Sequence, residues 1–345
     1  MPFADLDTIR TKVRRLTRSP SVAQLSDADI DQYINTFVIY DFPEHLRLFD
    51  LRTTLTFYTK PFIDVYETNT TDVTDPLYNF KNKYITIHEP LYIAGYQQFF
   101  SQSREQFFGI YPMVNSIASI GLVGDGVTAA FTGVVQFGSG PYYQPNPLLG
   151  THLLQNNVLF SSVDINGNGL ALHDVPASST VGNLVGDAGM GPNFINYITG
   201  QFSFVFSNPP AIGVPINSQT VPYVPALPQA VLYYEDKFTL RPVPDQPYRV
   251  NLEAYIIPTE LLATYQDPDI QQWWQYIAYG ASKKVFEDRM DTDSVQQIMP
   301  EFKMQERLVL RKTVVQYTNE RTGTIYTEQN GGLTSGGFGW GSGNI

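Results

Sequence analysis

Residues 199–207 read TGQFSFVFS, and this stretch indicates how the middle of the chain folds. Phe202, Phe204 and Phe206 alternate with smaller or polar residues, which is typical of a strand with one buried face. Gly200 supplies a turn in front of them. No Lys or Arg occurs from residue 105 to residue 236, so all 22 basic residues lie in the two flanks. Composition this uneven predicts two parts that are built differently.

The middle region is predicted to be all β. Turn pairs such as Asn166-Gly167 and Asn168-Gly169 punctuate it at a spacing typical of β-sandwiches. Beyond 199–207, strands are expected over 131–137, 153–160 and 231–234, and loops over 116–126 and 182–191. The sequence therefore predicts an inserted β-sandwich-like domain over residues 105–236.

The N-terminal flank predicts two helices followed by a strand. Apolar residues recur at helical spacing from Leu6 to Leu16. The second helix begins at residues 25–30, LSDADI, where Ser26 can cap the first turn, Asp29 can reach back to it, and Leu25 with Ile30 can form a hydrophobic staple. Residues 52–60, RTTLTFYTK, then alternate as a strand does.

The C-terminal flank is predicted to mirror this pattern. A strand begins at Lys237 and stops at prolines, and 248–257 is expected to pair with it. Asp267-Pro268 is predicted to open a helix. The expected apolar face of that helix comprises Ile270, Trp273, Trp274, Ile277, Ala281 and Val285. A last helix is expected over 292–317, bent at Pro300, with Val295, Ile298 and Phe302 inward.

These patterns together predict an α+β protein with two domains. Residues 1–104 and 237–321 form a discontinuous helical domain with a small sheet, and 105–236 forms the inserted domain. The length of 345 residues allows two buried cores. Residues 322–345 are expected to be an extended Gly/aromatic tail.

Composition excludes several classes of protein. Hydrophobic residues at 43% and aromatic residues at 14% are too abundant for a disordered chain, despite the net charge of −11. No apolar run approaches the roughly 18 residues that span a bilayer, and the first twenty residues do not resemble a signal peptide. The absence of Cys excludes disulfides, thiolate metal sites and a Cys nucleophile.

The sequence offers no catalytic motif, and no cofactor is expected. None of His45, His88, His152 and His173 lies at a metal-ligand spacing from another. Gly-x-Ser-x-Gly, a phosphate-binding loop and the dinucleotide-binding fingerprint do not occur. Paired carboxylates from distant strands stay open as an alternative, but the few acidic residues of the inserted domain suit turns better.

One turn resembles the start of a calcium loop. Asp164, Asn166 and Asn168 place side-chain oxygens at alternate positions, as a cation requires. The twelfth position of such a loop should be a bidentate carboxylate, but here it is Val175. We therefore expect a β-turn without a metal, with a bound cation as the weaker alternative.

Basic residues cluster once in the chain, on the first predicted helix. The cluster consists of Arg10, Lys12, Arg14, Arg15 and Arg18. One interpretation is a solvated helix face. The other is a surface that faces an acidic partner or passing DNA.

The tail, 322–345, carries a single charged residue, Glu328. Its composition cannot bury enough surface to fold alone. One interpretation is a disordered terminus. The other is an extended segment whose apolar anchors, Ile325, Tyr326, Phe338 and Trp340, dock onto a partner.

The flanks resemble the head-to-tail adaptor (connector) proteins of tailed bacteriophages. The resemblance rests on 25–35 (LSDADIDQYIN), 238–245 (FTLRPVPD), 258–261 (PTEL), 277–281 (IAYGA) and 286–289 (FEDR), in this order. The middle region is similar to β-domains of phage virion proteins at 194–200 (FINYITG) and 207–213 (SNPPAIG). A large insertion sets this chain apart from the smaller adaptors.

This resemblance implies a non-enzymatic structural protein at the head–tail junction of a virion, assembled in the host cytoplasm. It implies a ring homo-oligomer, dodecameric by the family pattern, whose tail docks onto the portal protein. Other implied partners are tail nozzle or fibre proteins and the genome DNA that passes through the channel; no membrane is involved.

A second reading makes the chain a tail-fibre or baseplate component. Its β-domain would then bind a host glycan or another tail protein. Tyr142, Tyr143 and Tyr197 are the residues that could stack on sugar rings.

Overall fold

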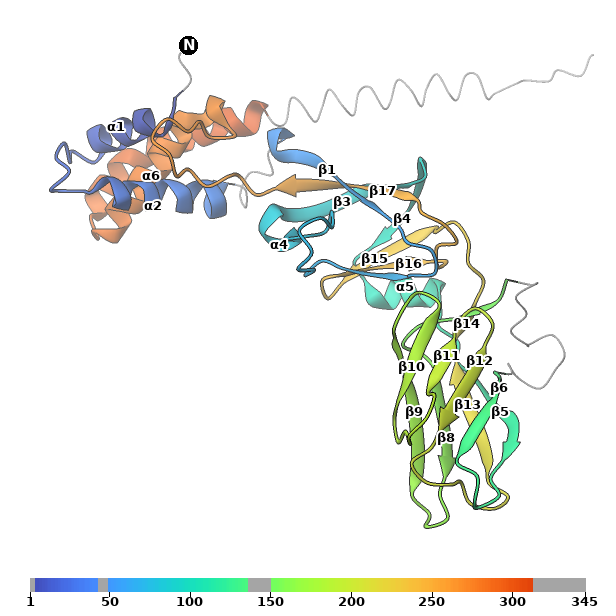
Figure 1. Ribbon diagram of the computed structural model, residues 1–345. Helices are drawn as coiled ribbons and strands as arrows, with labels where there is room; N and C mark the ends of the chain where they lie inside the picture. The colour runs from blue at the N-terminus through green and yellow to red at the C-terminus, as the bar shows by residue number, and fades with distance from the viewer. Residues whose placement is uncertain (1–3, 43–48, 136–149, 313–345) are drawn as a thin grey trace, which may run out of the picture. The chain divides into compact units, whose positions relative to one another are not determined.

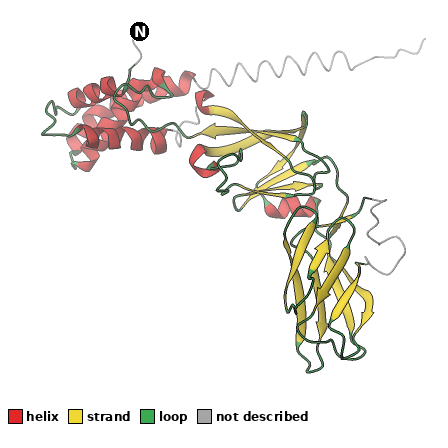
Figure 2. Ribbon diagram, in the orientation of Figure 1, coloured by secondary structure: helices red, strands yellow, loops and turns green. Residues whose placement is uncertain are grey.

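The computed structural model describes residues 4–42, 49–135 and 150–312 (Figure 1). It is a mixed α+β protein in which strands hold more of the chain than helices (Figure 2). The chain divides into two compact units. The helical unit comprises Met1–Thr53, Asn82–Ile87 and Ala254–Ile345, and the β unit comprises Thr54–Lys81 and His88–Glu253.

This division differs from the predicted domain boundaries. We expected the strands of both flanks to belong to the helical domain and 105–236 to fold separately. Instead, most of the flank strands group with the middle region in the β unit. The reason is that Ala230–Tyr234, inside the uncharged region, pairs with Lys237–Arg241 of the C-terminal flank and with Tyr96–Ser101 of the N-terminal flank.

The first two helices form as their sequences predict. Helix α1 (Leu6–Leu16) buries Leu6, Ile9 and Val13, and Asp5 caps its N-terminus by accepting a hydrogen bond from the Thr8 amide. Helix α2 (Asp27–Thr36) is capped by Ser26, whose hydroxyl accepts from the Asp29 amide and donates to the Asp29 carboxylate. A π-type turn, Phe37–Asp41, continues α2.

The C-terminal helices complete the same core. A 3-10 turn (Gln271–Trp273) leads into α6 (Trp274–Asp288), and residues 292–312 are helical through Pro300. The predicted inward residues Ile277, Ala281 and Val285 are buried. Helix α6 carries Gly280 where it meets Phe37 of the π-type turn, and a Cβ atom at this position would overlap the Phe37 ring.

The predicted helix start at Asp267-Pro268 is wrong. Residues 258–270 form an irregular loop, and regular α-helix begins at Trp274. The Asp269 carboxylate accepts a hydrogen bond from the Thr259 amide at 2.7 Å, so it closes this loop instead of capping a helix.

The first sheet has seven strands in the order β1-β17-β3-β4-β15-β16-β2. In that order their bounds are Arg52–Tyr58, Arg249–Ile256, Tyr84–Ile93, Tyr96–Ser101, Ala230–Tyr234, Lys237–Arg241 and Val65–Glu67. The short helices α4 (Phe80–Lys83) and α5 (Arg104–Ile110) lie in the connections before β3 and after β4.

The expected pairing of 237–241 with 248–257 is wrong. Strand β16 pairs with β15 and β2, while β3, β4 and β15 lie between it and β17. A two-residue turn, Glu235-Asp236, joins β15 to β16, and both residues have positive φ, as the tight hairpin turn requires. The partner of β16 is therefore β15, which precedes it directly in the chain, and not the segment 248–257, which follows it.

The second sheet has eight antiparallel strands in the order β5-β13-β8-β9-β10-β11-β12-β6. In that order their bounds are Ser116–Val123, Pro215–Thr220, Leu159–Val163, Gly169–Pro176, Val181–Gly186, Phe194–Asn196, Gln201–Val205 and Ala130–Val134. A further pair joins β7 (His152–Leu153) and β14 (Pro222–Tyr223). Phe202, Phe204 and Phe206 are all buried in the core of this sheet, as predicted.

Two predicted loops are in fact strands of this sheet. The segment 116–126 contains β5, and 182–191 contains most of β10. In β10, Gly182 is needed because a Cβ atom there would overlap the Tyr197 hydroxyl. Glycine at this position permits close packing inside a strand and is not the loop signal that its sequence context suggests.

The predicted strand over 153–160 is interrupted. Asn156 has φ of 57° between β7 and β8, so the chain turns there. The buried Asp174 carboxylate accepts hydrogen bonds from the amides of Asn156 (2.6 Å) and Val158 (2.8 Å). A distant carboxylate therefore fixes this turn.

Candidate interaction site

The loop 260–267 is the strongest candidate for an interaction surface on the helical unit. Together with Thr259 before it, its sequence is TELLATYQD. Two large apolar side chains project from it, with Leu262 75% exposed and Tyr265 84% exposed. The neighbouring Leu261 is buried and anchors the loop in the core. Glu260 and Asp267 are also exposed, so the loop surface combines apolar area with negative charge.

Gln266 holds the loop in shape from within. Its side-chain oxygen accepts hydrogen bonds from the amides of Leu262 (2.8 Å) and Ala263 (3.2 Å), and its side-chain nitrogen donates to the Glu260 carbonyl (2.9 Å). These contacts satisfy backbone groups that would otherwise need water. The exposed side chains of the loop are therefore presented by a fixed backbone.

The same loop is tied to both N-terminal helices. The amides of Leu6 and Asp7, at the start of α1, donate to the carbonyls of Gln266 and Thr264, each at 3.1 Å. The buried Asn35 of α2 exchanges two hydrogen bonds of 2.9 Å with the backbone of Leu261. Helix-start amides have no partner within the helix, so the loop stabilises α1 while α1 and α2 orient the loop.

The predicted basic cluster is largely used inside the helical unit. Arg10 forms two hydrogen bonds to Asp31, of 2.6 and 2.5 Å, and this contact raises the pKa of Arg10. Arg14 donates to the Leu25 carbonyl (2.7 Å) and to Asp27 (2.5 Å). Lys12 lies 5.5 Å from the centre of the Tyr279 ring.

Arg15 and Arg18 are the members of the cluster that face outward. Both are exposed, and no ion pair joins either one to a side chain in residues 4–42, 49–135 or 150–312. Of the five basic residues that the sequence offers for contact with a partner or with DNA, only these two are therefore free to make it within the described part of the chain. Arg10 and Arg14 instead bind α2 and the loop before it.

The predicted tail anchors Ile325, Tyr326, Phe338 and Trp340 lie outside the described residues. Their proposed docking role therefore stays a prediction from sequence. Tyr142, Tyr143 and His45 lie outside the described residues as well.

Tyr197 cannot stack on a sugar as the second reading requires. It is 1% exposed, and its hydroxyl donates to Asp174 at 2.7 Å. Burial and this hydrogen bond both raise the pKa of Tyr197. Its role is to fill the core of the eight-stranded sheet.

The turn at Asp164 is built from hydrogen bonds. The carboxylate accepts from the amides of Asn166 and Asn168, each at 2.8 Å, and from the Asn168 side chain at 3.1 Å. These bonds lower the pKa of Asp164, led by the Asn168 amide. Donors surround the oxygens that a cation would need, so this geometry favours the β-turn reading.

His152 is buried beside two aromatic rings in the β unit. The ring centres of Phe62 and Tyr223 lie 4.8 and 5.7 Å from it. Burial lowers the pKa of His152. Among the described residues, no three His, Asp or Glu side chains group in a way that could hold a metal ion.

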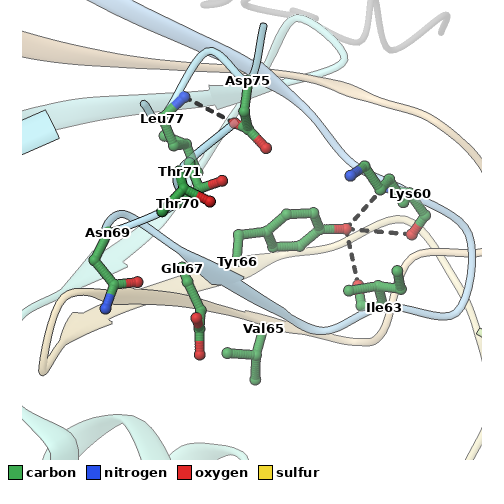
Figure 3. A pocket seen from close by; sticks show the side chains of 10 residues that line it. All are labelled: Lys60, Ile63, Val65, Tyr66, Glu67, Asn69, Thr70, Thr71, Asp75 and Leu77. Carbon is green, nitrogen blue, oxygen red and sulfur yellow. Dashed lines mark hydrogen bonds between the residues drawn. The ribbon is translucent and has the colours of Figure 1, made fainter. Parts of the chain in front are cut away.

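Two hollows open on the β unit. The first, of about 530 Å³, lies between β2 and the loop after it, and the Tyr66 hydroxyl in it donates to the Ile63 carbonyl and accepts from the Lys60 amide (Figure 3). The second has about 760 Å³. In it, Arg241 pairs with Asp64 at 2.7 Å and Lys237 with Glu67 at 3.1 Å, while Arg104 stacks near Phe108. Three acidic and three basic side chains line the second hollow, so its charges balance.

Comparison with models of known protein families gives no match, and comparison with curated proteins gives none. Within the described ranges, no helix has the length and apolar character to cross a membrane.

Few features of the sequence point to the loop 260–267 as an exposed surface. Its Asp-Pro pair suggested a helix start, and the exposure of Leu262 and Tyr265 depends on Gln266 and Asn35, which are ordinary polar residues in the sequence. One signal was present: no Lys or Arg occurs from residue 250 to residue 282, so the acidic residues there have no basic neighbour in sequence.

Proposed function

We propose that this protein is a non-enzymatic structural component of a tailed-phage virion, a head-to-tail adaptor that joins the portal to the tail. Its helical unit would be the adaptor domain, and its eight-stranded sheet would be the core of an inserted β-domain. Tail nozzle or fibre proteins would meet the β-domain, and the genome would pass through the ring.

The observation that carries this proposal is the helical unit built from both ends of the chain. Asn35 and Leu261, 226 residues apart, join α2 to the C-terminal flank by reciprocal hydrogen bonds. Four of the five flank segments that resemble the adaptor family lie in this unit (25–35, 258–261, 277–281 and 286–289), while 238–245 lies in the β unit. The middle region instead contributes a separate antiparallel sheet with its own phenylalanine core.

The portal contact is assigned to the tail. Ile325, Tyr326, Phe338 and Trp340 are apolar anchors in a segment with one charged residue. Such a segment suits docking as an extended strand or in a groove. Arg15 on α1 and Arg18, which follows the end of α1, are the exposed cations of the basic cluster that could face a partner or the DNA.

The test is binding to the portal protein encoded beside this chain in the same genome. Deletion of residues 322–345 should abolish binding while circular dichroism and the unfolding transition stay unchanged. Joint replacement of Phe338 and Trp340 by Ser should weaken binding strongly, and replacement of Ser335 and Ser342 by Ala serves as the matched control. Equal portal binding by the truncated and full-length chains would refute the role of the tail.

A further inference from the structure

We propose that the helical unit binds a second copy of this chain head to tail, with the loop 260–267 of one copy against the outer face of helix 292–312 of the next. This inference rests on the proposed function for its biological role, because it names the self-contact of an adaptor ring. Two exposed surfaces of the helical unit would form this contact.

The second surface is the outer face of helix 292–312. On its inner side, Phe302 and Val309 belong to the core of the helical unit, and Ile298 is buried as well. Helical spacing places a different set on the opposite side, all of them exposed. This outer face consists of Lys303, Met304, Arg307, Leu308 and Arg311.

The outer face is basic and apolar at once. Met304 is 50% exposed and Leu308 is 45% exposed, and they lie one turn apart. Lys303, Arg307 and Arg311 form no ion pair with any side chain in the described part of the chain. Arginine and methionine beside an apolar patch are residue types that protein interfaces favour.

The loop 260–267 has the complementary composition. Leu262 and Tyr265 supply apolar area, and Glu260 and Asp267 supply negative charge. Tyrosine is a frequent energetic centre of interfaces. Because Gln266 and the contacts to α1 and α2 fix the loop, little conformational entropy is lost when a partner covers it.

A second copy is the occupant that this arrangement favours. Both surfaces belong to the same helical unit, and both stay exposed within it, so neither covers the other. Opposite charges then favour contact between the loop of one copy and the helix of another. Two different patches on each subunit generate a ring when the rotation between copies closes.

The experiment uses two variants of the full chain. The loop variant carries Leu262→Ser and Tyr265→Ser, and the helix variant carries Met304→Gln and Leu308→Gln. All four side chains are exposed, so both variants should keep the circular dichroism spectrum of the native chain. Ile212→Ser, at an exposed apolar position of the β unit, is the matched control.

Sedimentation velocity and native mass spectrometry then measure association. The native chain and the Ile212→Ser control should associate beyond a dimer. Each variant alone should associate at least about tenfold more weakly, which corresponds to about 1.4 kcal/mol. An equimolar mixture of the two variants should form heterodimers and stop there, because one intact loop meets one intact helix face. Association of the native chain should also weaken as the salt concentration rises.

Three results would overturn the inference. The first is that the native chain stays monomeric at roughly 100 µM. The second is that the variants associate as strongly as the native chain, and the third is that the mixture forms no heterodimer. Portal binding and virion location are measured independently of these results. Failure of the self-contact can therefore be distinguished from failure of the adaptor function.

Discussion

Replacement of Gly280 by Ala tests whether the two ends of the chain share one core. The new Cβ atom would lie 2.5 Å from Phe37 Cδ2 and nearer still to Cε2 and Cζ, whereas carbon atoms pack best at about 3.5–4.0 Å. The Phe37 ring would therefore have to move by about 1 Å or more. Tyr276, Phe42 and Phe302 surround it, with ring centres at 5.2, 6.0 and 6.1 Å.

The expected loss of stability follows from two opposing terms. Overpacking of a buried site costs about 1–3 kcal/mol, and a clash against a ring enclosed by three others belongs at the upper end. Ala in a helix gains about 1 kcal/mol over Gly. Gly280→Ala should thus lower the free energy of unfolding of the helical unit by about 2 kcal/mol.

Tryptophan fluorescence during urea unfolding measures this change in the helical unit. Trp273 and Trp274 both belong to that unit, and a Trp340→Phe background removes the signal of the third tryptophan. With Phe37→Leu as the second change, Gly280→Ala should become neutral or stabilising, since the clash is relieved. Gly109→Ala in α5 of the β unit is the control for a helical glycine without a clash, because a Cβ atom there meets nothing within 4 Å, and its unfolding is followed by circular dichroism. Higher stability of Gly280→Ala with Phe37 intact would show that Phe37 does not pack against Gly280.

Three further predictions concern the hydrogen bonds described above. Arg14→Ala should lower the free energy of unfolding by about 1–3 kcal/mol, since it removes contacts to Leu25 and Asp27. The control Arg15→Ala should change it by less than about 0.5 kcal/mol. Equal effects of the two substitutions in urea unfolding would contradict the structural role of Arg14. Tyr197→Phe should lower the thermal stability of the β unit, measured by circular dichroism, by about 1–2 kcal/mol because Asp174 loses a donor, and an unchanged transition would argue against this contact. The hydrogen bond to Asp288, followed by burial, raises the pKa of Tyr33 to about 12, so the stability that it contributes is complete below pH 10 and is lost as the pH rises through about 12. Absorbance titration of Tyr33→Phe against the native chain checks this value, and a difference signal centred near 10 would disprove it.

Local patterns explain what the sequence could predict. The capping residue Ser26 and the spacing of Leu6, Ile9 and Val13 act within one or two turns, so α1 and α2 form as expected. The alternation at Phe202, Phe204 and Phe206 is equally local and correctly predicts a strand.

Contacts between distant residues explain what the sequence could not predict. The partner of β16 depends on the hairpin turn at Glu235-Asp236 and on pairing with β2, which lies about 170 residues earlier in the chain. Gly182 resembles a loop residue until Tyr197 is seen to occupy the space beside it.

The two candidate surfaces also differ in whether local spacing or distant contacts determine them. Residues of one helix, such as Met304 and Leu308, could have been assigned to an outer face from spacing alone. The loop 260–267 could not, because its shape depends on Asn35 and on the first amides of α1. The basic residues of α1 were recognised in sequence, but their partners Asp27 and Asp31 were not.

The most direct test of the adaptor function is immunogold labelling of purified virions from the phage that encodes this chain, with antibodies raised against the purified protein. We expect gold particles at the junction of head and tail, and we expect this label to be lost from virions whose tails have been detached together with the neck. Label at the distal tip or on fibres, or no label on intact and disrupted particles, would rule out the adaptor function.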